Sequence, residues 1–143
     1  MRSRKRILYP FLLALAFAVG AFGHIFLHPA PPEELPVTLT LRTEALSAHL
    51  LPSLPDEGTS LSLCDRPCLL VARWEEPRAL LSRENGRSQI TPSRLYYTLS
   101  LTVSVRGHLK EGRLYLGDRL LLRGDELTLA GENLVIHATL LDY

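Results

Sequence analysis

The chain is poor in the residues that build reactive or metal-binding centres. Its 143 residues include two cysteines, one methionine, one tryptophan and five scattered histidines, at positions 24, 28, 49, 108 and 137. A structural zinc site usually takes two Cys pairs, or one Cys pair with two closely spaced histidines, and neither set is present. We therefore expect no metal site and no cofactor.

A strong charge of one sign is also missing. The chain has 16 basic and 15 acidic residues, and four of the basic ones lie within the first six positions. Positions 28–143 therefore carry 12 basic against 15 acidic residues, a net charge of −3. A nucleic-acid-binding protein would be expected to show a basic patch with interleaved aromatics. We accordingly expect no nucleic-acid partner.

One long apolar run is present near the start of the chain. Residues 7–27, ILYPFLLALAFAVGAFGHIFL, contain no Asp, Glu, Lys or Arg. At about 1.5 Å per residue, such a run spans the roughly 30 Å hydrocarbon core of a bilayer. The basic leader MRSRKR at 1–6 should stay in the cytoplasm. The sequence therefore predicts a single-pass protein of the cell membrane, which contacts the lipid through residues 7–27 and has its C-terminal part outside.

A cleaved signal peptide is the alternative interpretation of the same run. Residues 7–19 would be its apolar core, and Ala21-Phe22-Gly23 would be a small-x-small cleavage site. The apolar stretch continues through residues 25–27, which favours a retained anchor. Both interpretations export the rest of the chain, either tethered or secreted.

The exported part divides into a spacer and one small domain. Residues 28–36, HPAPPEELP, are Pro-rich and lack an apolar period, as an extended spacer would. Residues 37–143 are enough for one modest core. We therefore predict a leader at 1–6, a transmembrane helix at 7–27, a spacer at 28–36 and an extracytoplasmic β-rich domain at 37–143.

Alternation of apolar and polar residues predicts a mainly β fold. Gly/Asp turns separate short strand-like segments, a pattern typical of a small antiparallel β-barrel or sandwich. One short helix is expected at 44–51, with Thr43 as its N-cap and Pro52 at its end. Residues 38–73 and 101–139 show a similar order of features, which suggests two similar halves. The predicted strands are 37–43, 60–63, 69–74, 95–105, 113–116, 119–123, 126–129 and 134–141.

The segment 77–92 interrupts this pattern. It is polar apart from residues 79–81, and Asn85-Gly86 marks a tight turn. We predict a mobile surface excursion. Most of a regularly spaced set of arginines falls in or beside it: Arg73, Arg78, Arg83, Arg87 and Arg94. This set is interpreted first as a solvated face, and the last four are the candidate contacts for an anionic group.

The two cysteines leave three interpretations open. Cys64 and Cys68 lie between two predicted strands, and a three-residue turn would set them opposite each other at a distance that a disulfide accepts. Two free thiols are the second interpretation. A metal or redox site is the third, although a thioredoxin-like centre has two intervening residues and this pair has three.

A short motif looks like part of an enzyme. Residues 116–122, LGDRLLL, resemble the Gly-Asp-Arg strand box of bacterial type I signal peptidases. That resemblance implies a Ser nucleophile and a desolvated Lys base. The family's Ser-x-Met box is missing because Met1 is the only methionine, and Lys110 falls in a predicted turn. Tight turns at Gly117-Asp118 and Gly124-Asp125 explain the motif more simply.

The overall arrangement resembles a second group. The basic leader, the single N-terminal anchor, the exported β-rich domain and the ending LYLGDRLLLRGDELTLAGENLVI at 114–136 are similar to the family called domain of unknown function 4330. These are uncharacterised single-pass membrane proteins of Gram-positive and related bacteria. The resemblance implies an architecture and a location, and no catalytic residues.

These features favour a function without catalysis. No nucleophile, base and oxyanion donors can be assembled on one predicted face, so we expect a non-enzymatic domain that acts by protein contact in the bacterial cell envelope. Trp74, Tyr96 and Tyr143 are candidate contact residues, with core packing as the alternative. The second function hypothesis is a ligand- or envelope-polymer-binding domain that uses the Arg-rich segment 77–94, and the third is a signal-peptidase-like hydrolase.

Overall fold

The computed structural model describes residues 13–20, 23 and 30–143. Residues 13–20 and Gly23 are helical, whereas the rest of the predicted 7–27 span, the 1–6 leader and residues 28–29 of the spacer lie outside the described residues. None of the described helices is long and apolar enough to cross a membrane. The chain divides into two compact units, Met1–Glu33 and Glu34–Tyr143, and every strand among the described residues lies in the second unit.

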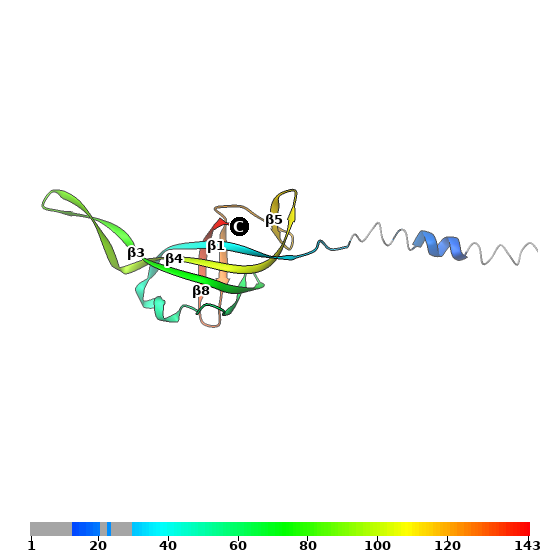
Figure 1. Cartoon of the computed structure of the whole chain (residues 1–143), viewed down its shortest axis with the longest axis horizontal. Helices are drawn as coiled ribbons and strands as arrows, with labels where there is room; N and C mark the ends of the chain where they lie inside the picture. The colour runs from blue at the N-terminus through cyan, green and yellow to red at the C-terminus, as the bar shows by residue number, and fades with distance from the viewer. Residues whose placement is uncertain (1–12, 21–22, 24–29) are drawn as a thin grey trace, which may run out of the picture. The chain divides into compact units, whose positions relative to one another are not determined.

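The predicted mainly β fold is confirmed (Figure 1). All strands belong to one antiparallel sheet in the order β1-β8-β7-β2-β3-β4-β5-β6. Because β1 also pairs with β4, six of the eight strands follow one another in a partial ring, with β5 and β6 branching from it. The strands are β1 (Leu35–Ser47), β2 (Ser60–Leu63), β3 (Arg66–Glu84), β4 (Arg87–Lys110), β5 (Arg113–Leu116), β6 (Arg119–Leu121), β7 (Glu126–Ala130) and β8 (Val135–Asp142).

The core is built almost entirely from leucine and valine on one face of each strand. The period-two alternation in β4 buries Leu99, Leu101, Val103 and Val105 and turns the intervening Ser and Thr residues outward. Each other strand of the ring adds at least two residues to the same cluster. The predicted alternation of residues 95–105 is therefore confirmed from Leu99 to Val105.

The predicted helix at 44–51 is wrong. β1 continues to Ser47, past an irregularity between Thr43 and Leu46 where Ala45 has a φ of 60°. Leu46 and Ser47 pair with Tyr97 and Tyr96 of β4, so sheet pairing overrides the helical preference of this segment. A 3₁₀ helix, η1 (Ala48–Ser53), follows and includes Pro52.

The predicted mobile excursion at 77–92 is also corrected. β3 and β4 stay paired as far as Glu84 and Arg87. The predicted Asn85-Gly86 turn is confirmed, with φ values of 53° and 76° that place both residues in the left-handed region a two-residue hairpin turn uses. The predicted two similar halves do not form separate sheets, because β1 pairs with both β4 and β8, and the duplication stays a prediction.

Gly107 allows β5 to lie close against β4. A Cβ atom at this position would lie 2.8 Å from the Tyr115 carbonyl oxygen and about as close to Leu114 and Leu116, both of which are buried. Backbone cannot move aside as a flexible side chain can, so only glycine fits without a shift of the β4–β5 pair.

We predict that Gly107→Ala lowers the free energy of unfolding by about 1–3 kcal/mol, the usual cost of overpacking. Gly131→Ala is the matched control, because its Cβ would meet the Leu61 side chain at 3.2 Å, and that side chain can rotate. Urea unfolding followed by circular dichroism measures both. An equal effect of the two substitutions would contradict the close β4–β5 approach.

Candidate functional site

The end of the β3–β4 hairpin is highly exposed. We call residues 78–94 the arm. The β2 strand pairs with β3 only as far as Leu69, and β1 pairs with β4 only as far as Tyr96. Within the arm, each strand therefore pairs only with the other, and the ribbon extends well beyond the ring (Figure 1).

One face of the arm is apolar. Leu81 and Ile90 lie directly opposite each other, and each side chain is 75% exposed. Ala79 and Pro92 form the next pair on the same face. The other face is largely polar, and its Ser82 and Thr91 hydroxyls lie 3.2 Å apart. A solvated two-stranded ribbon gains little stability from such exposed apolar pairs unless something covers them.

The arm carries a charge opposite to that of the remaining domain. Its four arginines against Glu84 give +3, whereas the rest of residues 28–143 has eight basic and 14 acidic residues, or −6. Arg83 lies opposite Ser88 on the apolar face near the tip, and Arg87 lies opposite Glu84 on the other face. Arg78 and Arg94 lie at the base, about 20 Å from the tip at the usual rise per residue. The four candidate anion contacts share the arm but do not converge on one point.

A buried serine fixes the place where the arm leaves the ring. The Ser93 hydroxyl accepts hydrogen bonds from the N–H groups of Leu95 and Tyr96, at 3.1 and 3.0 Å. This turn falls at the register irregularity between Pro77 and Ala79. Ser93 is the only buried polar residue among those whose burial the structure describes, and it holds the chain in the bend from which the arm projects.

Arg73 is separate from the other arginines of the predicted set. Its Nη1 donates to the carbonyl oxygens of Leu54 and Pro55, at 3.2 and 2.8 Å. Its Nε lies 3.0 Å from a carboxylate oxygen of Glu75. These contacts connect β3 to the segment after η1, so Arg73 has a structural role that its spacing in the sequence did not reveal.

The cysteines do not face each other as a three-residue turn would require. The turn between β2 and β3 is Cys64-Asp65, closed by the pair Leu63 and Arg66, and Cys68 lies opposite Leu61. Both thiols are free in the structure. Burial, and secondarily the nearby Cys64, raise the pKa of Cys68 to about 11. The guanidinium of Arg119 donates to the Cys64 sulfur at 3.3 Å.

We predict that only Cys64 reacts when the native protein is treated with iodoacetamide at pH 8. With a pKa of about 11, roughly one Cys68 thiol in a thousand is ionised at that pH, and only the thiolate is nucleophilic. Mass spectrometry should find one added group in the native protein and two after unfolding. Two rapid additions to the native protein would contradict the burial of Cys68, and none before reduction would indicate the predicted disulfide.

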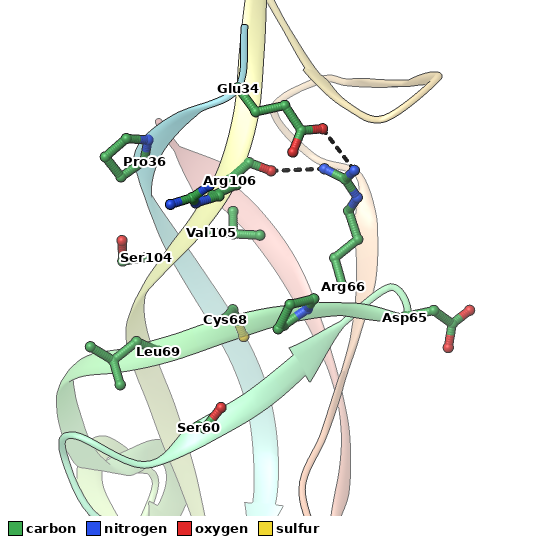
Figure 2. A pocket seen from close by; sticks show the side chains of 11 residues that line it. Glu34, Pro36, Ser60, Asp65, Arg66, Cys68, Leu69, Ser104, Val105 and Arg106 are labelled. Carbon is green, nitrogen blue, oxygen red and sulfur yellow. Dashed lines mark hydrogen bonds and ion pairs between the residues drawn. The ribbon is translucent and has the colours of Figure 1, made fainter. Parts of the chain in front are cut away.

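A hollow lies at one end of the ring beside the Cys64-Asp65 turn (Figure 2). Its volume is about 610 Å³. Arg66 pairs with the Glu34 carboxylate at 2.7 Å and donates to the Arg106 carbonyl oxygen at 2.9 Å. These contacts fasten the start of β1 to the β2–β3 turn. The charge of Arg66 is already paired, and the hollow is lined further by Ser60, Leu69 and Ser104 and by the charged residues Asp65 and Arg106.

The segment that resembles the signal peptidase box has the local geometry of turns. Gly117 and Gly124 have φ values of 60° and 92°, and the Asp125 carboxylate accepts from the N–H of Leu122 at 2.9 Å. Lys110 is exposed at the end of β4. His137 is on the outward face of β8, with its Nδ1 3.3 Å from the Thr128 hydroxyl. The structure does not bring these groups together.

The three aromatic residues predicted as contacts or core fillers are all exposed. Trp74 lies on β3, and Tyr96 lies on β4 near the base of the arm. Tyr143 follows the end of β8. Exposed aromatic side chains are enriched at recognition surfaces. The prediction that these three residues pack in the core is therefore wrong.

Comparison of the chain with protein-family models, with curated proteins and with solved structures finds no match.

Proposed function

We propose that this chain is a non-enzymatic, membrane-anchored domain of the bacterial cell envelope that binds another envelope protein through the arm. The observation that carries the proposal is the exposed apolar pair Leu81 and Ile90 on a ribbon that packs against no other strand. A contiguous exposed apolar surface with polar residues around it commonly marks a contact site. The membrane setting and the likeness to domain of unknown function 4330 rest on the sequence.

The positive charge of the arm favours a partner whose contact surface is acidic. The apolar face would be buried at the centre of the contact, and Arg83 and Arg78 lie at its two ends. Arginine suits the rim of such an interface because its planar guanidinium binds carboxylates in two places at once. The ring would serve as a rigid base for the arm, and we propose that its six strands form a small closed barrel around the leucine core.

A shortened arm tests the proposal. In this variant residues 80–91 are deleted and Asn-Gly is placed between Ala79 and Pro92. The new two-residue turn then closes the hairpin at the Ala79–Pro92 pair. Because the deleted residues pair only with each other, the ring should keep its stability. Cross-linking in intact cells followed by mass identification should show a neighbour of the full-length chain that is lost with the shortened arm. An unchanged set of neighbours would contradict the proposal.

The second candidate function is binding of an anionic envelope polymer. It is favoured by the charge of +3 on the arm within a domain whose remainder has −6. The double substitution Arg83→Glu with Arg87→Glu reverses the charge at the tip and leaves Leu81 and Ile90 in place. Co-sedimentation with a purified polyanion such as a teichoic acid should then be lost. Unchanged co-sedimentation would exclude this function.

A further inference from the structure

We propose a second binding site, for a neutral linear glycan, on the outer face of β1, β4 and β3. This site lies apart from the arm and does not depend on the function proposed for it. It consists of a row of hydroxyl side chains with one exposed tryptophan at its end. The hydroxyl face, as we call it, comprises Thr38, Thr40, Ser100, Thr102 and Ser104 together with Trp74.

The strand register places these residues in a regular grid. On β4, Ser100, Thr102 and Ser104 alternate with the buried core residues and therefore point outward. Thr40 and Thr38 of β1 lie opposite Thr102 and Ser104. Neighbouring strands are about 4.8 Å apart and alternate residues about 6.8 Å apart. Among the described residues, no hydrogen bond engages the side chains of these five residues, so their hydroxyl groups are available to a ligand.

Trp74 completes the grid. It lies opposite Ser100, its side chain is 65% exposed, and its Nε1 donates to the Glu76 carboxylate at 2.9 Å. This bond satisfies the only polar atom of the indole and restrains the ring while leaving much of its surface open. A sugar ring has C–H groups on its faces and hydroxyls around its rim. It can therefore stack on an aromatic ring while its rim hydroxyls bond to neighbouring Ser and Thr side chains.

The length of the face and a hollow at one end of it favour an extended ligand. At the end away from Trp74, the hollow of Figure 2 is lined by Ser104, Leu69 and Arg106. From Ser100 to Arg106, β4 covers about 20 Å. A single sugar would occupy only part of this length, whereas a short linear oligosaccharide would follow the strand.

The charge of the face favours a neutral ligand over a polyanion. The only charged outward residues along it are Arg42, Arg106 and Glu76, and Arg42 lies 3.9 Å from the Glu44 carboxylate. The Glu76 carboxylate beside Trp74 would repel an anionic polymer. The hydroxyl face thus differs in chemistry from the arm, whose charge is positive.

The test uses the full chain in a detergent without a sugar headgroup, with the β-1,4-linked tetramer of N-acetylglucosamine as the probe. Trp74 is the only tryptophan, so its fluorescence reports on this face alone. We expect a saturable change of emission as the tetramer is added. In calorimetry, Trp74→Ala and the pair Ser100→Ala with Thr102→Val should each weaken binding about tenfold or more. Tyr143→Ala, which alters an exposed aromatic elsewhere, should leave affinity unchanged.

Three results would overturn this proposal. The first is no fluorescence change and no heat up to about 10 mM of the tetramer, a concentration that would detect even millimolar affinity. The second is equal affinity of Trp74→Ala and the unaltered chain. The third is self-association that Trp74→Ala abolishes without any glycan response, which would assign the face to a second copy of the chain. None of these results bears on the arm, whose test uses different residues.

Discussion

Replacement of Leu81 and Ile90 by Asp should abolish partner binding and leave the fold intact. Each side chain is 75% exposed, and the two face each other on the apolar side of the arm. Full burial of a Leu or Ile side chain contributes about 1.5–3 kcal/mol. Loss of both would therefore weaken the complex by at least about 3 kcal/mol, roughly a hundredfold. Burying two carboxylates beside an acidic partner would add to the loss.

A matched control separates the apolar contact from a general effect on the arm. Ser82→Asp with Gln89→Asp introduces the same two charges at the neighbouring pair, on the opposite face. Binding should fall much less in this variant. The measurement is the yield of the arm-dependent cross-link in intact cells, with urea unfolding of each purified variant as the check on folding. Equal loss of the cross-link in both variants would show that charge on the arm, and not its apolar face, decides binding.

Leu101→Ala should produce the largest loss of stability. Leu101 is only 1% exposed and lies on β4 between Leu41 of β1 and Arg73 of β3. A buried Leu→Ala change costs about 2–5 kcal/mol because it removes apolar burial and leaves a cavity. A domain of this size has only about 5–15 kcal/mol in total. We therefore expect the unfolding midpoint to fall by roughly 10 °C or more.

Leu109→Ala is the control for that prediction. Leu109 lies on the same strand but is 63% exposed, so its loss should change stability by no more than about 0.5 kcal/mol. Thermal unfolding followed by circular dichroism compares the two variants. Similar midpoints would mean that Leu101 does not lie in the core and that the register of β4 against β1 is wrong.

The strands could be predicted from the sequence because their signals are local. Alternation along 95–105 and the Gly/Asp turns of the C-terminal segment depend only on neighbouring residues. The helix expected at 44–51 failed because the partner of Leu46 is Tyr97, some fifty positions away. The helical preference of residues 44–51 gives no information about pairing with a strand so far away in the sequence.

The arm is not predicted from the sequence for a related reason. Residues 77–92 are polar apart from 79–81 and have Asn-Gly at their centre, a pattern that predicts a mobile surface excursion. The same turn between Ala79-Leu80-Leu81 and Ile90 is also a hairpin signal, and β3 and β4 stay paired beyond the register irregularity between Pro77 and Ala79. The sequence does not predict that Arg73 has a structural role separate from the other arginines. Its hydrogen-bond partners, the carbonyl oxygens of Leu54 and Pro55, are brought next to it only by the tertiary fold.

The most direct test of the arm as the docking element is site-specific photo-cross-linking in intact cells. A photoreactive amino acid is placed at position 81 on the apolar face of the arm, and in a second variant at position 122, where Leu122 is exposed but lies after β6, outside the arm. We predict a discrete protein adduct from position 81 that is absent from position 122 and lost when Ile90 is also changed to Asp. Adducts from position 122 alone, or none from position 81, would contradict this account.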